Sequence, residues 1–392
     1  MESLLQKQSP LKKHVELFAS KVTPFYYYDL DLLEKTVSRA SQAAARYNYK
    51  LHYAFKANWN QPILEIIRKY DCGADCVTGN EVLHALKNGF LPEQIVYAGV
   101  GKTDREIIIG LENNIFSFNC ESLPEIEIIN ELASRFNKKA NIALRINPNV
   151  NAKTHHYITT GLEENKFGIN PWEFDKVMSL IRSCENIALT GLHFHIGSQI
   201  TDLQVYTNLC SRVNEINHYF TDNGFMVNHL NLGGGIGVDY HHPDENPIID
   251  FEGFFSMIHS FLSPLPHQEI HFEPGRCIVA QCGSLISRVT YVKKGVNTEF
   301  LILDAGMTEL MRPALYQAFH KIENLSSNTH EATFYDVVGP ICESSDCFGK
   351  KIKLPISKRD DIIAIRTVGA YGEVMASRYN MRELNESVYT IH

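Results

Sequence analysis

Lys56 follows a mostly apolar run at residues 51–55, and Ala57 and Asn58 come directly after it. The run predicts a buried strand, so the lysine stands where a charge is unusual. A lysine in such a place loses hydration, which favours its neutral form. The neutral amine is a nucleophile that can hold a carbonyl cofactor as a Schiff base. Taken alone, the residue is more often a lysine that extends from a strand end into solvent.

Glu273 and Arg276 flank Pro274 and Gly275 in a tight turn that follows another strand-like run. A buried carboxylate at such a turn needs a cationic partner. Arg276 is the ordinary partner, in a structural ion pair. The alternative is a protonated pyridine nitrogen, which Glu273 would hold charged so that the ring becomes a strong electron sink.

Gly233, Gly234 and Gly235 follow an apolar run at residues 229–232. Glycines can turn backbone amides toward an anion without obstruction by side chains, so a phosphate fits there. The same residues could also serve only to permit a tight turn.

His193 and His195 are two residues apart on a predicted strand, so their side chains share one face and could bind a metal. A barrel metallohydrolase would need further ligands, and the neighbouring motifs do not offer a clear His and Asp set. We therefore expect no metal. His195 is better placed to stack on a flat cofactor ring, with His193 packed within the barrel.

Polar residues in the last third of the chain could address a substrate. Arg312 and Tyr316 can converge on a carboxylate, although a surface arginine beside a core tyrosine is the commoner arrangement. Cys342 stands beside Glu343 on a Gly-Pro turn, where a thiol is less typical of the core. Tyr371 lies between glycines and could be part of a simple turn.

An alternation of strand-like and helical runs must position these residues. Eight strands are expected at 51–55, 74–77, 95–98, 116–118, 142–146, 189–194, 229–232 and 270–272. Apolar residues at helical spacing fill 62–70, 81–88, 123–136 and 251–262. Eight such units predict an α/β fold, a (β/α)8 TIM-like barrel, whose chemistry collects at the carboxyl ends of the strands. Asp75 lies in the second of these strands and Arg145 near the end of the fifth. The segment 147–168 is long for a loop between a strand and a helix, which suggests a lid or a wall over the site.

After Arg276 the pattern changes to strands with few helices between them, at 284–292, 299–303, 333–338 and 361–368. This predicts a C-terminal β-rich domain at 280–392, after a barrel at 29–279. Residues 1–28 are expected to join the β-rich domain, because a strand at 24–28 must be paired or covered.

Composition limits the class of protein. The chain has 392 residues, 44% of them hydrophobic, and a formal net charge of -8. This charge argues against a nucleic-acid surface and favours a small-molecule partner. The apolar stretches are far shorter than a membrane span, and no signal-peptide pattern follows the first lysines. Nine scattered cysteines fit reduced thiols, so a cytoplasmic location is expected.

Six motifs together resemble the alanine-racemase-fold decarboxylases that use pyridoxal phosphate. They are Tyr53-Ala54-Phe55-Lys56-Ala57-Asn58, His195-Ile196-Gly197-Ser198, Gly233-Gly234-Gly235, Glu273-Pro274-Gly275-Arg276, Cys342-Glu343-Ser344-Ser345-Asp346 and Gly369-Ala370-Tyr371-Gly372. The resemblance runs from about residue 24 to residue 382, and the order of all six motifs makes it specific.

The resemblance implies a role for most of these residues. Lys56 would form the internal aldimine with pyridoxal 5'-phosphate, His195 would stack on the cofactor, and Glu273 would pair with its ring nitrogen. The remaining cofactor contacts would come from Asp75, Ser198, Gly233, Gly234, Gly235, Gly275, Arg276 and Tyr371. Cys342, from the other subunit of a head-to-tail homodimer with shared active sites, would protonate the carbanion left after carbon dioxide departs.

The reaction that the resemblance implies is conversion of meso-2,6-diaminoheptanedioate to L-lysine and carbon dioxide, the last step of lysine biosynthesis. Arg276, Arg312, Tyr316, Glu343 and Tyr371 would bind the amino-acid substrate. A sister decarboxylase for ornithine, arginine or a D-amino acid remains an alternative, but it would give Arg312 and Tyr316 no distal carboxylate to bind. A binding homologue without catalysis is less consistent with the presence of both Lys56 and Cys342.

Overall fold

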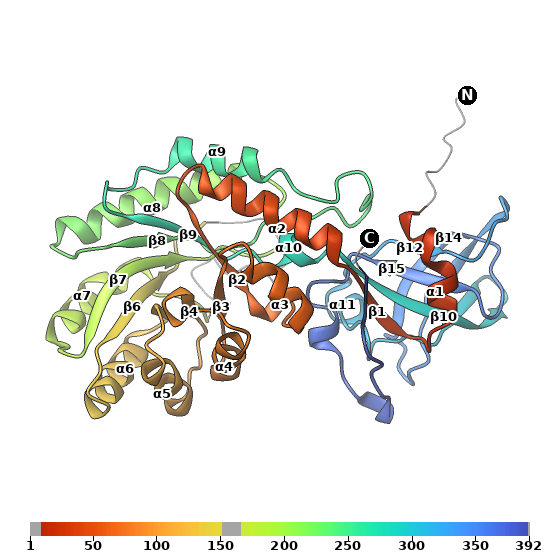
Figure 1. Ribbon diagram of the computed structural model, residues 1–392, viewed down its shortest axis with the longest axis horizontal. Helices are drawn as coiled ribbons and strands as arrows, with labels where there is room; N and C mark the ends of the chain where they lie inside the picture. Colours follow the sequence, from red (N-terminus) through yellow and green to blue (C-terminus); the bar gives the residue numbers. More distant parts are fainter. Residues whose placement is uncertain (1–8, 151–165, 391–392) are drawn as a thin grey trace. The chain divides into compact units, whose positions relative to one another are not determined.

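The computed structural model describes residues 9–150 and 166–390 of the chain. These residues form two compact units (Figure 1). One unit contains residues 34–237 and 250–278, and the other contains the residues before 34, residues 238–249 and the residues from 279 onward. Residues 238–249 lie within the range that the sequence assigned to the barrel, but they group with the β-rich unit.

The first unit is a closed barrel of eight parallel strands, in which each strand pairs with the next and the last pairs with the first. The strands are β2 (Lys50–Ala54), β3 (Gly73–Cys76), β4 (Ile95–Tyr97), β5 (Ser117–Cys120), β6 (Ala140–Ile146), β7 (Ile187–Phe194), β8 (His229–Asn231) and β9 (Glu269–Phe272). Each of the eight expected runs overlaps one of them, so the predicted barrel is confirmed.

Helices alternate with the barrel strands, beginning with α2 before β2, and the longer helices lie outside the strands in Figure 1. They are α2 (Leu30–Ala45), α3 (Gln61–Arg68), α4 (Gly79–Lys87), α5 (Asp104–Glu112), α6 (Leu123–Arg135), α7 (Phe174–Ser183), α8 (Gln204–Asp222), α9 (Phe251–Phe261) and α10 (Arg276–Val279). Local signals begin some of them: Thr78 Oγ1 accepts the Glu81 amide at 3.1 Å at the start of α4. Such a cap satisfies an amide that the helix itself leaves without a partner.

Three histidines form a buried cluster in the barrel unit. His52 Nε2 lies 2.9 Å from His271 Nδ1, and the His229 and His271 rings stack with their centroids 5.0 Å apart. Glycines make room for them, because a Cβ on Gly191 would come within 2.2 Å of the His229 ring. Burial lowers the pKa of His52 to about 3 and the pKa of His229 well below its usual range. The His52 and His229 rings are therefore neutral at pH 7.

The second unit is built on a mostly antiparallel sheet with the strand order β12-β15-β10-β11-β13-β14. These strands are β10 (Gly283–Lys294), β11 (Glu299–Leu303), β12 (Ile322–Asn324), β13 (Ala332–Val338), β14 (Cys347–Pro355) and β15 (Ile362–Arg366). β1 (Phe25–Asp29) pairs with β10 and with β16 (Val388–Thr390). An N-terminal strand is thus paired within this unit, and the predicted β-rich architecture is confirmed.

Two short helices complete this unit, α1 (Val15–Ala19) and α11 (Arg312–Tyr316). Leu11 and Phe18 pack with Phe25 and Tyr27 of β1 and with Ile286 of β10 in a buried cluster. Among the described residues, no helix is both long enough and apolar enough to cross a membrane. Residues 151–165, most of the expected lid, lie outside the described part of the chain.

Candidate active site

Lys56 follows β2 in a single 3-10 turn, Phe55–Ala57. Its Nζ lies 3.3 Å from Oδ2 of Asp75 in β3, and the lysine side chain is 36% exposed whereas that of Asp75 is fully buried. Burial raises the pKa of Asp75, Glu273 adds to this effect, and the charge of Lys56 opposes it. The amine is therefore accessible to a small molecule and lies beside a buried carboxylate, and its role as the nucleophile stays a prediction.

Glu273 follows β9 and is buried among side chains from three other strands. Its carboxylate lies 2.9 Å from His193 Nε2, 2.7 Å from Asn231 Nδ2 and 3.3 Å from Asn119 Nδ2. Burial alone would raise the pKa of Glu273, but His193 and Lys56 hold it well below its usual range. The group is an ionised carboxylate inside the barrel, which suits a cationic ring nitrogen.

Arg276 does not pair with Glu273, although an ion pair between them was the ordinary expectation. Its Nη2 donates to Ser198 Oγ at 2.9 Å, and its side chain is buried. Arg276 begins α10 after β9, and Ser198 follows β7. Gly275 lies in the turn between Glu273 and Arg276, and its carbonyl accepts the Ile278 amide at 3.0 Å. Ser198 and Arg276 thus form one polar pair at the carboxyl ends of the strands.

The glycine loop after β8 is too closely packed for any side chain. A Cβ on Gly234 would come within 2.1 Å of the Glu273 carbonyl oxygen, and Gly233 and Gly235 have φ angles of +70° and +99°. The Gly233 amide donates to Asn231 Oδ1 at 2.9 Å, so it is already used. Within the described residues the Gly235 amide donates to no partner, which leaves it available to an anion.

His195 lies beside this loop, just after β7. Its Nδ1 accepts the Gly234 amide at 3.3 Å, so the two motifs are joined. Burial, with help from the charges of Arg145 and Lys56, holds the pKa of His195 well below its usual range. The ring is therefore neutral and does not repel a positively charged cofactor ring against which it would stack.

The β-rich unit carries the other predicted site residues. Arg312 is buried and Tyr316 is half-buried, the reverse of the commoner arrangement of a surface arginine beside a core tyrosine. The Arg312 guanidinium donates to Tyr240 Oη at 3.0 Å and to His320 Nε2 at 3.1 Å. Tyr371 is half-buried and has a φ of +55°.

Cys342 and Glu343 lie on an exposed turn of the same unit. Asp346 holds the turn, because its carboxylate accepts the Ile341 amide at 2.7 Å. The Cys342 thiol is free and exposed, and Glu343 accepts a hydrogen bond from Tyr379 Oη at 2.8 Å. Their convergence with the barrel residues on one site stays a prediction.

Sequence reasoning missed the groups that hold Glu273. Asn119 is the second-to-last residue of β5, and Asn231 is the last residue of β8. Both side chains are buried. Their position could have indicated this role, because asparagine side chains are unusual at the carboxyl ends of otherwise apolar barrel strands. A second missed feature is the buried ion pair of Arg145 with Glu121, at 2.6 Å.

Comparison with known proteins identifies the family of this chain. Residues 30–280 match the family model described as pyridoxal-dependent decarboxylase, pyridoxal binding domain. The closed barrel and this match together define a barrel enzyme of the pyridoxal-dependent type.

Curated relatives refine this class. Proteins named diaminopimelate decarboxylase from Bacteroides thetaiotaomicron and Helicobacter pylori are 54% and 41% identical, over 94% of this chain and 96% and 90% of their own lengths. The crystal structure of the Helicobacter pylori enzyme complexed with L-lysine is similar at a TM-score of 0.89, and it covers 95% of this chain and 92% of that one. The chain belongs to the diaminopimelate decarboxylases within the pyridoxal-dependent decarboxylase family. It is a carboxy-lyase whose cofactor is pyridoxal 5'-phosphate.

Proposed function

We propose that the protein converts meso-2,6-diaminoheptanedioate to L-lysine and carbon dioxide, the last step of lysine biosynthesis. The observation that carries this proposal is the accessible amine of Lys56 beside a buried, ionised Glu273, in a chain 54% identical to a diaminopimelate decarboxylase.

The barrel residues fit pyridoxal phosphate on their own evidence. Asp75 Oδ1 and Asn119 Oδ1 are buried without a hydrogen-bond partner in the described residues, which is costly unless a bound group satisfies them. The glycine loop packs directly against the backbone of neighbouring strand ends, so no side chain of its own stands between its amides and a bound anion. When bound, pyridoxal phosphate supplies a ring that accepts the electron pair released as carbon dioxide leaves.

The barrel residues then have distinct roles toward the cofactor. Lys56 Nζ would hold the cofactor through a covalent bond. Glu273 would keep a proton on the ring nitrogen, and His195 would pack its neutral ring against the cofactor. Ser198, the Gly235 amide and Arg276 would bind the phosphate, together with Tyr371 from the β-rich unit.

The substrate carries an amine and a carboxylate at its distal end, so a selective site needs groups for both. We assign Arg276, Arg312 and Tyr316 to the carboxylate and Glu343 to the ammonium, with Tyr371 beside them. Arginine suits the first task because its planar guanidinium matches a carboxylate.

Cys342 Sγ delivers the proton to the substrate carbon after carbon dioxide leaves, from the second subunit of a homodimer with shared active sites. The exposed thiol on a turn held by Asp346 supports this assignment. We further infer a cytoplasmic location, which the nine free thiols support, and no role in nucleic-acid binding, in keeping with the net charge of -8.

Substrate preference tests the proposal. Ornithine that reacts at its own α-carbon brings no second carboxylate to the buried Arg312, and removing one partner of a buried ion pair costs about 3 to 5 kcal/mol. The specificity constant for meso-diaminopimelate should therefore exceed that for ornithine by roughly a hundredfold or more. Arg312→Ala should lose most of this preference and still bind cofactor. Comparable specificity constants in the unmodified enzyme would assign the chain to the sister decarboxylases instead.

A further inference from the structure

Two side chains from different segments determine the direction of the Arg312 guanidinium. Nη1 donates both to Tyr240 Oη at 3.0 Å and to His320 Nε2 at 3.1 Å. The guanidinium carbon lies 5.2 Å from the centroid of the Tyr240 ring, and the Tyr240 and His320 rings meet edge to face at 5.1 Å. Arg312 itself is buried, so water does little to orient it.

A backbone carbonyl sets the tautomer of His320. His320 Nδ1 lies 2.9 Å from the carbonyl oxygen of Arg366. A carbonyl oxygen can only accept, so Nδ1 must carry the proton. Nε2 then presents its lone pair to Arg312 Nη1, which can only donate. The imidazole is a directed acceptor for the guanidinium and does not merely pack against it.

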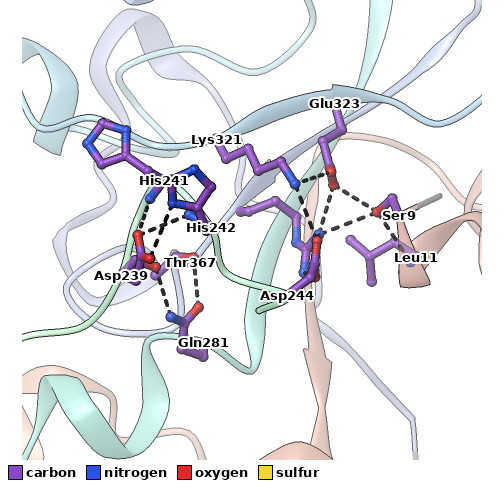
Figure 2. A network of polar contacts seen from close by, with 11 residues as sticks. Ser9, Leu11, Asp239, His241, His242, Asp244, Gln281, Lys321, Glu323 and Thr367 are labelled. Atoms are coloured by element: carbon purple, nitrogen blue, oxygen red, sulfur yellow. Dashed lines mark hydrogen bonds and ion pairs between the residues drawn. The ribbon is translucent and has the colours of Figure 1, made fainter. Parts of the chain in front are cut away.

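Tyr240 lies on the 238–249 segment, which is tied to the end of β15 on both sides of the tyrosine. On one side, Gln281 Nε2 donates to the Asp239 carbonyl at 2.9 Å, and Gln281 Oε1 accepts from Thr367 at 2.9 Å (Figure 2). On the other side, the Asp244 carboxylate accepts from Arg366 Nη2 at 2.7 Å. Arg366, the last residue of β15, and Thr367, which follows it, thus hold the 238–249 segment in place, Thr367 through Gln281.

The Arg366 side chain is itself rigidly held. It is 7% exposed, and its guanidinium also contacts Glu323 at 2.8 Å. Lys321 lies 2.8 Å from Glu323 and 3.3 Å from Asp244. In Figure 2, dashed lines join Lys321 to both Glu323 and Asp244. Buried, charge-assisted contacts of this kind restrict side-chain motion. One arginine therefore fixes the 238–249 segment through its side chain and His320 through its carbonyl.

We propose that His320 and Tyr240 are positioning residues that aim the Arg312 guanidinium at the distal carboxylate of the amino-acid substrate. This inference rests on the proposed function, because it assigns Arg312 to that carboxylate. Recognition by a planar guanidinium depends on its orientation, and an arginine held by two partners loses less entropy on binding.

A matched pair of substitutions separates this role from simple packing. In His320→Asn, the side-chain amide can still donate to the Arg366 carbonyl but is too short to accept from Arg312. In His320→Gln, the longer side chain places an oxygen near the former Nε2 position. Tyr240→Phe keeps the ring and removes only the hydroxyl. His330→Asn, at an exposed position of the same unit, is the control.

The measurements use the holoenzyme with meso-diaminopimelate, L-lysine and cadaverine, which is L-lysine without its carboxylate. His320→Asn and Tyr240→Phe should raise KM for meso-diaminopimelate and weaken L-lysine binding about tenfold each, with a much smaller change in kcat, since a hydrogen bond to a charged group is lost. Cadaverine binding and the cofactor absorbance should stay unchanged. His320→Gln should recover part of the loss, and His330→Asn should behave like the unmodified enzyme.

If His320→Asn and Tyr240→Phe weakened the binding of L-lysine and of cadaverine equally, the two residues would have a merely structural role and the inference would be overturned. Unchanged KM and L-lysine binding in both variants would overturn it while leaving the proposed function intact, provided that the unmodified enzyme forms lysine. If His320→Asn does not fold, Tyr240→Phe and His320→Gln decide by the same comparison. An unmodified enzyme without activity on meso-diaminopimelate would overturn both the proposed function and this inference.

Discussion

The buried histidine cluster predicts that the protein loses stability steeply as the pH falls below about 6.5. His52 is 4% exposed, and burial lowers its pKa from 6.5 to about 3, with the neighbouring His271 acting in the same direction. In the unfolded chain this histidine binds a proton near pH 6.5, whereas in the folded barrel it stays neutral. Between pH 6.5 and about pH 3 the unfolded state therefore binds more protons than the folded state. The free energy of unfolding decreases as the pH is lowered through this range.

The magnitude follows from the same shift. One histidine of this kind lowers the free energy of unfolding by about 1.4 kcal/mol for each pH unit, or about 2 to 3 kcal/mol between pH 6.5 and pH 4.5. His229, whose pKa is also lowered by burial, acts in the same direction. His52→Asn keeps an amide that can donate to the Gln94 carbonyl and removes the titrating ring.

The assay is urea unfolding followed by fluorescence at a series of pH values from 7 to 4.5. His52→Asn should make the dependence on pH shallower by about 1.4 kcal/mol per unit, whatever its effect on stability at pH 7. The control is Val82→Ala, a buried substitution in α4 that removes no titrating group and should lower stability equally at every pH. An unchanged slope in His52→Asn would refute the argument from burial.

Three further predictions concern the proposed site. Borohydride reduction of the holoprotein should fix the cofactor on Lys56, which mass spectrometry of the peptides would locate; an adduct on another lysine would exclude this assignment. Glu273→Gln should lower kcat by about a hundredfold or more, because an amide cannot hold the ring nitrogen protonated; a kcat close to normal would contradict the role. Cys342→Ala should keep the cofactor spectrum but lose about 10²- to 10⁴-fold in turnover. Mixing it with Lys56→Ala should restore part of the activity, and no recovery despite subunit exchange would count against shared sites.

The barrel was predictable from the sequence because its strands are short apolar runs separated by helices with their own start signals, such as Thr78 before α4. Lys56 and Glu273 were found for a related reason, since charges directly after apolar strands are unusual. Two strands of the β-rich unit, β12 and β16, were missed. Each has only three residues, which is too short to give a periodic pattern in the sequence.

The partners of the site residues could not be read from the sequence. Asn119 meets Glu273 across 154 positions, and Tyr240 meets Arg312 across 72. Such pairs are created by the folded topology and have no local pattern. The burial of Arg312 could not be derived from the sequence for the same reason, because Tyr240 and His320, which contact its guanidinium, are contributed by other segments.

The most direct test of the central claim is incubation of the purified holoprotein with meso-diaminopimelate while both products are followed. Pyridoxal-dependent decarboxylation at one carbon predicts L-lysine and carbon dioxide in equal amounts, and no product from a Lys56→Ala protein prepared in the same way. Carbon dioxide without lysine, lysine formation that survives loss of Lys56, or no product from a fully loaded sample would contradict the account.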